Sequence, residues 1–310
     1  MSVQWTTLAA ATRVTPGSTV DLMKHFDPGR RDEKLGKDGG IAALAEAEAA
    51  LLDLQDRFFA QADRSLLIVL QGIDAAGKDG TIKHVMSGLN PEGVDIHSFK
   101  APSAGEQAHD YLWRHQAALP ELGRIAVFNR SHYENVLITR VHPELLWPRT
   151  AVLDSKDLWQ RRYRDVNEWE RYLTDNGTII VKVFLNLSKG EQERRFLARI
   201  EEPEKNWKFS ADDLRERRFW DHYQKAFGDM LSHTSTAWAP WHVIPADHKW
   251  FSHLSTSAVL LETLRDLNPH YPQVDAAVKT ELAQAKKELL GTNTGKRAQL
   301  PPRPTPEEIG

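Results

Sequence analysis

Short apolar runs recur along the chain, and longer segments with helical periodicity separate them. The clearest run covers residues 65–71, Ser-Leu-Leu-Ile-Val-Leu-Gln, and carries no charge. A continuous run of this kind is typical of a parallel strand that is covered on both faces. The further predicted strands are residues 94–99, 124–129, 178–187 and 241–245. Strands that alternate with helices predict an α/β domain built from right-handed crossover units.

The segments between the strands predict helices and divide the chain. Helical spacing is found at residues 41–62, 78–87, 105–119, 153–176, 211–231, 250–267 and 274–290. A further helix is expected to begin at the capping box Ser188-Lys189-Gly190-Glu191. The turn-rich segment 1–40 is predicted to be an irregular arm. We therefore expect one domain over residues 41–270, followed by a helix and a flexible tail over residues 271–310.

The first strand leads into a glycine-rich segment, Gly-Ile-Asp-Ala-Ala-Gly-Lys-Asp-Gly, at residues 72–80. Its spacing, Gly-x4-Gly-Lys, is that of a phosphate-binding loop (P-loop), in which backbone N–H groups surround phosphates and the lysine reaches the terminal ones. The helix that begins near the lysine adds its N-terminal dipole. The predicted phosphate ligands are Gly72, Ala75, Ala76, Gly77, Lys78 and Gly80. The alternative is an ordinary strand-to-helix turn with an exposed lysine.

Two aspartates depart from the usual P-loop. Asp79 stands where Ser or Thr normally offers a hydroxyl to magnesium, and Asp74 lies inside the cradle. A carboxylate in this place repels a phosphate unless a divalent cation lies between them. We therefore predict that Asp74 and Asp79 hold Mg²⁺, or Mn²⁺ in its place.

Polar and basic residues follow the second and third predicted strands. Lys100 stands at the carboxyl end of the second strand, where open α/β sheets bind ligands, and Arg114 lies on the next predicted helix. The third strand ends in Asn129 and Arg130, and Glu134 follows one turn later. Arg130 is placed to neutralise phosphoryl oxygens, whereas Asn129 takes the place of a magnesium-binding acid, for which Glu134 is the nearest substitute. The alternative is a helix cap with surface charges.

A basic segment at about residues 190–210 predicts a lid. Arg195 and Arg199 lie on the helix after the fourth strand, and Lys208 follows in the next turn. Basic residues on a helix and a turn suit a lid that closes over phosphates and excludes water. A solvated basic face is the alternative interpretation.

Composition limits what the protein can bind. The 310 residues are 41% hydrophobic and 27% charged, with a net charge of −3, so no overall field attracts nucleic acid and any polyanion site must be locally basic. The absence of cysteine excludes disulfides and thiol catalysis. No run approaches the roughly 18 apolar residues of a membrane span, which predicts a cytoplasmic protein without a membrane partner.

These motifs together give the chain a resemblance to the family-2 polyphosphate kinases. It covers about residues 66–267, with Gly-Ile-Asp-Ala-Ala-Gly-Lys-Asp-Gly at 72–80, Ser-Phe-Lys-Ala-Pro at 98–102, Leu-Trp-Arg at 112–114, Phe-Asn-Arg-Ser-His-Tyr-Glu at 128–134, Arg-Phe at 195–196, Trp-Lys at 207–208 and Ala-Pro-Trp at 239–241. The resemblance implies a thymidylate kinase-like P-loop fold, in which helices and a helical lid flank a five-stranded parallel sheet. It also implies magnesium-dependent phosphoryl transfer between inorganic polyphosphate and a nucleotide in a homo-oligomer.

The form Asn-Arg-Ser-His-Tyr-Glu resembles the subgroup that phosphorylates both nucleoside monophosphates and diphosphates, such as AMP and ADP, with Glu134 as a distinguishing residue. Many relatives carry aspartate where this chain has Asn129. The resemblance implies that Asp74, Asn129 and Glu134 approach the nucleotide. Polyphosphate is then expected along Lys100, Arg114, Arg130, Arg195, Arg199 and Lys208. The expected catalytic residues are Asp74, Lys78, Arg130 and Glu134.

Two other functions suit the same P-loop. One is an ATP-dependent kinase of nucleotides or small molecules on this fold. The other is a regulatory protein that binds a nucleotide without transferring a phosphate, although the guanine-reading Asn-Lys-x-Asp element is absent from the sequence. Carboxylates beside the loop favour catalysis over simple binding.

Overall fold

A five-stranded parallel sheet forms the centre of the protein, in the computed structural model that describes residues 3–146 and 157–292. The strand order is β2-β3-β1-β4-β5. The strands are β1 (Ser65–Gly72), β2 (Val94–Ser98), β3 (Ile125–Asn129), β4 (Thr178–Asn186) and β5 (Trp241–Pro245). The predicted strands are thus confirmed, each within two residues at its ends. Because β1 lies between β3 and β4, the loop that follows it opens at the middle of the carboxyl edge of the sheet.

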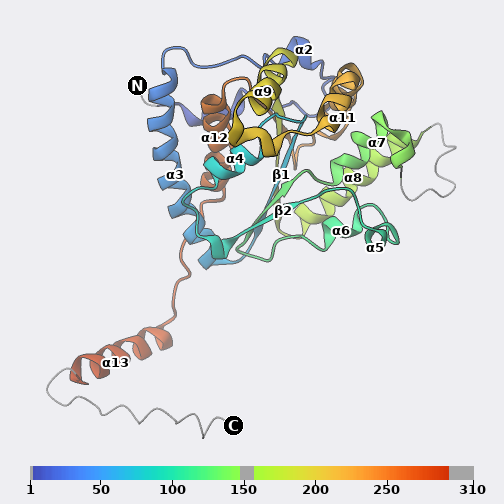
Figure 1. Cartoon of the computed structure of the whole chain (residues 1–310). Helices are drawn as coiled ribbons and strands as arrows, with labels where there is room; N and C mark the ends of the chain where they lie inside the picture. Colours follow the sequence, from blue (N-terminus) through green and yellow to red (C-terminus); the bar gives the residue numbers. More distant parts are fainter. Residues whose placement is uncertain (1–2, 147–156, 293–310) are drawn as a thin grey trace, which may run out of the picture. The chain divides into compact units, whose positions relative to one another are not determined.

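Helices cover both faces of the sheet (Figure 1). On one face, α12 (Lys249–Leu267) packs against α3 (Gly36–Gln61), α4 (Lys78–Val85) and α1 (Trp5–Ala10). On the other, α8 (Leu158–Asp175) packs on β4 and against α11 (Trp220–Thr234). Residues 66–70 of β1 are almost fully buried between these layers, as their uninterrupted apolar sequence requires.

Of the remaining described helices, five have four to six residues and two are longer. They are α2 (Leu22–His25), α5 (Ala104–Gln107), α6 (Trp113–Gln116), α7 (Ile138–Val141), α9 (Lys189–Glu201), α10 (Ala211–Glu216) and α13 (Ala276–Thr292). The 3-10 turns are η1 (Pro91–Gly93), η2 (His132–Val136), η3 (Pro143–Leu145), η4 (Pro203–Lys208) and η5 (Arg217–Phe219). The chain divides into two compact units, residues 1–270 and 271–310, and α13 belongs to the second. None of the helices described is long and apolar enough to span a membrane.

Two predicted helices are interrupted. The prediction of one helix over residues 105–119 is wrong, because the chain turns between α5 and α6, where Asp110 accepts hydrogen bonds from the N–H groups of Leu112 and Trp113. The prediction of one helix over residues 211–231 is also wrong, because η5 separates α10 from α11. The predicted start of α8 at residue 153 lies outside the described residues, as does the tail beyond residue 292.

The segment predicted as an irregular arm is partly regular and contributes to the core. It contains α1 and α2, and α3 already begins at Gly36. Val14 is buried, and its N–H donates to the carbonyl of Trp241 at 2.8 Å. Arg13 forms an antiparallel bridge with His242 on the outer strand β5. The arm thus covers an edge of the sheet that would otherwise expose unpaired backbone groups.

Candidate active site

The P-loop between β1 and α4 adopts a strained turn. Gly77 has φ of +108°, and Ala75 has φ of +64°, in the left-handed region that a non-glycine residue rarely adopts. The Lys78 ammonium donates to the carbonyl of Gly72 at 2.6 Å. Burial lowers the pKa of Lys78, and the nearby Arg130 lowers it further. The lysine is therefore a desolvated cation held against its own loop, where an anion would gain from the low dielectric.

Arg195 on α9 holds the P-loop by hydrogen bonds to its backbone. Its guanidinium donates to the carbonyls of Ala75 at 2.8 Å and Ala76 at 2.9 Å, and to that of Ala246 at 2.5 Å. The side chain is only 8% exposed. Arg195 lines the cavity, as predicted, but its donors are directed at backbone carbonyls and at Glu191. The predicted role of Arg195 as a polyphosphate ligand therefore requires some of these donors to change partner.

Ser188 caps the start of helix α9, and its hydroxyl accepts from the N–H of Glu191. The expected reciprocal bond of a capping box is replaced, because the N–H of Ser188 donates to Asp247 at 2.8 Å. Glu191 instead pairs with Arg195 at 2.8 Å. This arrangement ties the start of the predicted lid to the end of β5.

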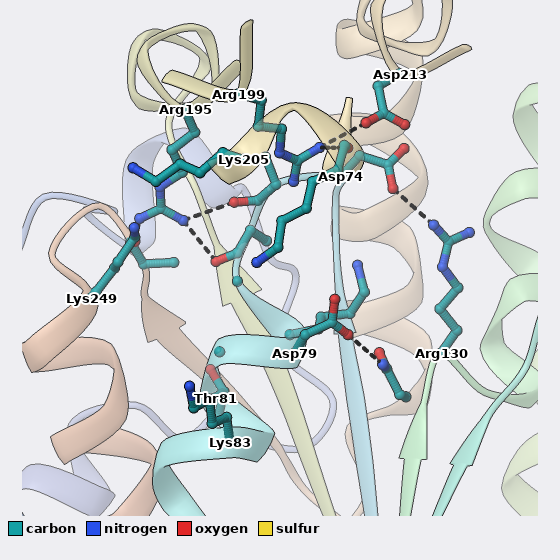
Figure 2. A pocket seen from close by; sticks show the side chains of 18 of the residues that line it. Asp74, Asp79, Thr81, Lys83, Arg130, Arg195, Arg199, Lys205, Asp213 and Lys249 are labelled. Carbon is teal, nitrogen blue, oxygen red and sulfur yellow. Dashed lines mark hydrogen bonds and ion pairs between the residues drawn. The ribbon is translucent and has the colours of Figure 1, made fainter. Parts of the chain in front are cut away.

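Both loop aspartates are paired across the sheet edge (Figure 2). Arg130 donates to Asp74 at 2.8 Å, and the amide of Asn129 donates to Asp79 at 2.7 Å. Arg130 has φ of +60°, so a second non-glycine residue at this edge is strained. Burial opposes the charge of Arg130, but Glu134 and Asp74 outweigh it and raise its pKa. The ends of β1 and β3 thus bring the predicted residues Asp74, Asp79, Asn129 and Arg130 together.

The basic segment faces the P-loop. Arg199 of α9 pairs with Asp213 of α10 at 2.8 Å, and Lys205 extends into the cavity (Figure 2). The amide of Asn206 donates to the carbonyls of Arg199 and Ile200, and so caps the end of α9. These contacts hold α9, η4 and α10 together over the loop.

A cavity of about 1230 Å³ lies between these elements. Within the described residues, ten Lys and Arg side chains and five carboxylates line it. The predicted site residues on its wall are Asp74, Ala75, Ala76, Gly77, Lys78, Asp79, Gly80, Lys100, Asn129, Arg130, Arg195, Arg199 and Lys208. The cavity is therefore locally basic in a protein whose net charge is negative.

Sequence analysis did not propose Lys83, His84, Asp213 or His253, which also line the cavity. His84 stacks on His253, with ring centroids 4.7 Å apart. Lys83 and His84 stand within two turns of the P-loop on α4, so helical spacing alone could have indicated them. Asp213 and His253 come from distant elements, and no local signal marks them.

A second cavity of about 560 Å³ adjoins the first, and Lys100 and Arg130 line both. It contains Arg114 and Glu134, beside apolar side chains that include Phe99, Ile138 and Leu146. Arg114 is 8% exposed and donates to the carbonyl of Lys100 at 2.8 Å. Arg114 thus shares the second cavity with Lys100 and Arg130, and the lid arginines Arg195 and Arg199 line the first.

Glu134 lines this second cavity, close enough to the P-loop for Lys78 and Asp74 to affect its pKa. Burial raises its pKa, while the nearby Arg130 and Lys78 act in the opposite direction. With its amide oxygen accepting from Ser131, Gln71 at the end of β1 donates to Glu134 at 3.0 Å. The remaining predicted ligand, Gly72, ends β1 and offers its carbonyl to Lys78, and it does not line the main cavity.

Comparison with known proteins identifies the family of this chain. The model of the family described as Polyphosphate kinase 2 (PPK2) matches residues 34–272. The chain belongs to the PPK2 family. The resemblance found in the sequence is therefore confirmed. As members of this family are kinases, the protein is a phosphotransferase.

Similar PPK2 proteins match over nearly their full length. An ADP-polyphosphate phosphotransferase of Rhodopseudomonas palustris is 51% identical over 284 residues, which cover 90% of this chain and 97% of the relative. An AMP/ADP-polyphosphate phosphotransferase of Meiothermus ruber is 44% identical over 266 residues, covering 86% and 96%. The crystal structure of Polyphosphate Kinase 2 from Arthrobacter aurescens TC1 superposes with a TM-score of 0.82 at 39% identity, covering 90% of this chain and 96% of that one. The predicted P-loop kinase fold is thereby confirmed.

Proposed function

We propose that this PPK2 protein transfers phosphoryl groups between inorganic polyphosphate and AMP or ADP, with magnesium. The observation that carries the proposal is the basic cavity around the P-loop, in which ten of the described Lys and Arg side chains face five carboxylates. The relatives from Rhodopseudomonas palustris and Meiothermus ruber are named for transfer between polyphosphate and ADP or AMP. Ten cationic side chains around one cavity suit a long polyanion better than a single triphosphate.

In this proposal polyphosphate occupies the main cavity, with its reacting end at Lys78. Arg199, Lys205 and Lys208 neutralise its charge from the lid side. Phosphoryl transfer demands alignment and charge neutralisation rather than covalent chemistry, so a site of Lys, Arg and Asp without a nucleophile is sufficient. When substrate binds, Arg130 exchanges its hydrogen bond to Asp74 for one to the transferred phosphoryl group.

The nucleotide approaches from the second cavity. Lys100 and Arg130 stand where the two cavities meet and contact both substrates. The apolar side chains of Phe99, Ile138 and Leu146 suit a base or ribose better than a polyanion. Glu134 and Asn129 border the acceptor phosphate, and Arg114 supports Lys100 through its carbonyl.

Asp74 and Asp79 would hold the magnesium ion between donor and acceptor. Mg²⁺ is usually bound by one or two carboxylates together with substrate phosphates and water. Two carboxylates on one cavity wall fit this mode, and the described residues contain no cluster of three or more ligating side chains that would form a dedicated protein cage. When bound, the ion neutralises developing charge on the phosphoryl oxygens.

The proposal is tested with purified full-length protein, AMP or ADP, long-chain polyphosphate and Mg²⁺, without any nucleoside triphosphate. We expect ADP to form from AMP and ATP to form from ADP, and the Lys78→Ala variant to form both far more slowly. The ATP-dependent kinase alternative predicts no product in this mixture and predicts turnover when ATP replaces polyphosphate. A regulatory binder predicts no transfer in a single turnover with either donor. The same assay with GMP and GDP measures the base preference.

A further inference from the structure

A buried polar network lies directly behind the segment that carries Arg130 and Glu134. Lys182 in the middle of β4, Glu170 on α8 and Tyr133 on η2 are all fully buried. In the sheet, Lys182 pairs with Val69 of β1 and with Trp241 of β5. A lysine at such a position costs much free energy unless its charge and all its donors are satisfied.

The network satisfies these donors completely. The Lys182 ammonium donates to Glu170 at 2.6 Å, to the Tyr133 hydroxyl at 2.8 Å and to the carbonyl of Thr234 at 2.7 Å. The Tyr133 hydroxyl in turn donates to Glu170 at 2.7 Å, and His132 Nε2 lies 3.1 Å from the same carboxylate oxygen. Burial works against the charged carboxylate, but Lys182 and His132 outweigh it and lower the pKa of Glu170. Glu170 is therefore an anion that accepts from three side chains.

Two of these side chains belong to the segment that bears the reactive groups. His132 and Tyr133 stand between Arg130 and Glu134, and their rings point into the core while the other two line the cavities. Arg130 is held at φ of +60°, a conformation that persists only where the surroundings impose it. The P-loop contacts this segment as well, since Asp74 pairs with Arg130.

We propose that Glu170, Lys182 and Tyr133 are positioning residues, whose buried network fixes residues 130–134 and so holds Arg130 and Glu134 in the geometry required for transfer. This inference rests on the proposed function. A buried ion pair is weak evidence for stability, because apolar or neutral replacements of similar volume are often as stable. A positioning role makes a different prediction. When the charges of Lys182 and Glu170 are removed together, the protein should still fold, but its kcat should fall.

The test is the double substitution Lys182→Met with Glu170→Gln, which removes both charges together and retains an oxygen acceptor for His132. We expect the melting temperature to stay within a few degrees of the parent and kcat to fall by about 10- to 100-fold, since small displacements of reacting groups have effects of this size. The Kd of polyphosphate, measured by titration calorimetry, should change by less than kcat does, because Arg130 is the only residue of segment 130–134 that lines the main cavity. A kcat within twofold of the parent overturns the inference.

Tyr133→Phe is the second variant, and it tests the positioning role even if the double variant fails to fold. It removes one hydroxyl and preserves the ring, which makes an edge-to-face contact with Trp241. We expect a several-fold lower kcat in the parent background and a smaller loss in an Arg130→Ala background, where only the effect through Glu134 remains, since residues that act through one group are not additive. Equal losses in both backgrounds, or no loss in the parent background, contradict the inference.

Arg124→Gln with Asp95→Asn is the matched control. This pair, at 2.9 Å, joins β2 to the residue before β3 at the amino edge of the sheet, remote from the cavities. Its neutralisation should leave kcat unchanged. If the parent itself transfers no phosphate from polyphosphate, the proposed function fails and this inference fails with it, whereas an active parent with equally active variants overturns the inference alone.

Discussion

The Lys78 ammonium lies 2.6 Å from the carbonyl of Gly72, so the lysine that defines the P-loop closes a ring with the first residue of the motif. This contact supports the turn before substrate binds and keeps the cation desolvated. When a phosphate replaces the carbonyl as partner, little reorganisation is required, which is the condition for strong electrostatic stabilisation of a transition state.

Lys78→Ala is expected to lower kcat by about 100- to 1000-fold, the usual effect of removing one preorganised donor. Polyphosphate-dependent formation of ATP from ADP measures it. Lys279→Ala, on an exposed position of α13, serves as the control and should retain full activity. Near-parental turnover in Lys78→Ala would mean that the P-loop lysine does not contact the transferred group.

Arg195→Ala should affect stability as well as activity. It leaves the carbonyls of Ala75, Ala76 and Ala246 without their donor, at about 1–3 kcal/mol for each buried group that finds no water. We expect a lower melting temperature and a weaker Kd for polyphosphate. Arg194→Ala is the matched control on the same helix, because Arg194 is 71% exposed and pairs only with Glu191 among the contacts described. Equal melting temperatures for the two variants would argue against the bracing role.

Glu134 predicts a pH dependence. Burial raises its pKa above 4.5, so the folded protein binds this proton more tightly than the unfolded chain. Its contribution to stability is therefore greatest below the unfolded pKa and is lost as the pH rises through the folded pKa. Glu134→Gln should gain melting temperature relative to the parent as the pH is raised from 4 to 8. A role of ionised Glu134 in transfer predicts that kcat/KM of the parent falls at acidic pH and that this fall is absent in Glu134→Gln. The same acidic fall in the variant would exclude such a role.

The wall of the main cavity opposite Arg130 should decide how strongly the protein prefers long polyphosphate to short polyphosphate. Lys83 and Lys249 lie across the cavity from Arg130 (Figure 2). His253, which also lines this cavity, contributes no charge at neutral pH, since burial and then His84 lower its pKa to about 4. We expect Lys83→Ala to weaken the Kd of long polyphosphate by about three- to fivefold and to leave that of tripolyphosphate unchanged. Equal weakening for both ligands would place Lys83 beside the reacting end instead.

The sequence by itself determined the strands, the P-loop and the family. Apolar runs and the Gly-x4-Gly-Lys spacing are local patterns, since a strand buried on both faces and a loop that surrounds phosphates each require particular residues at consecutive positions. For the same reason Asp74, Asp79, Asn129 and Arg130 could be predicted at one sheet edge, because the carboxyl ends of neighbouring parallel strands meet there.

Only the tertiary structure decided which partners these side chains take. Arg195 and Arg199 look alike in the sequence, yet one braces the loop carbonyls and the other pairs with Asp213. Likewise, nothing local to β4 indicates that Lys182 finds Glu170 and Tyr133, because each comes from a different element. Long side chains reach partners that are distant along the chain, so their hydrogen bonds are set by how helices pack on the sheet and not by sequence spacing.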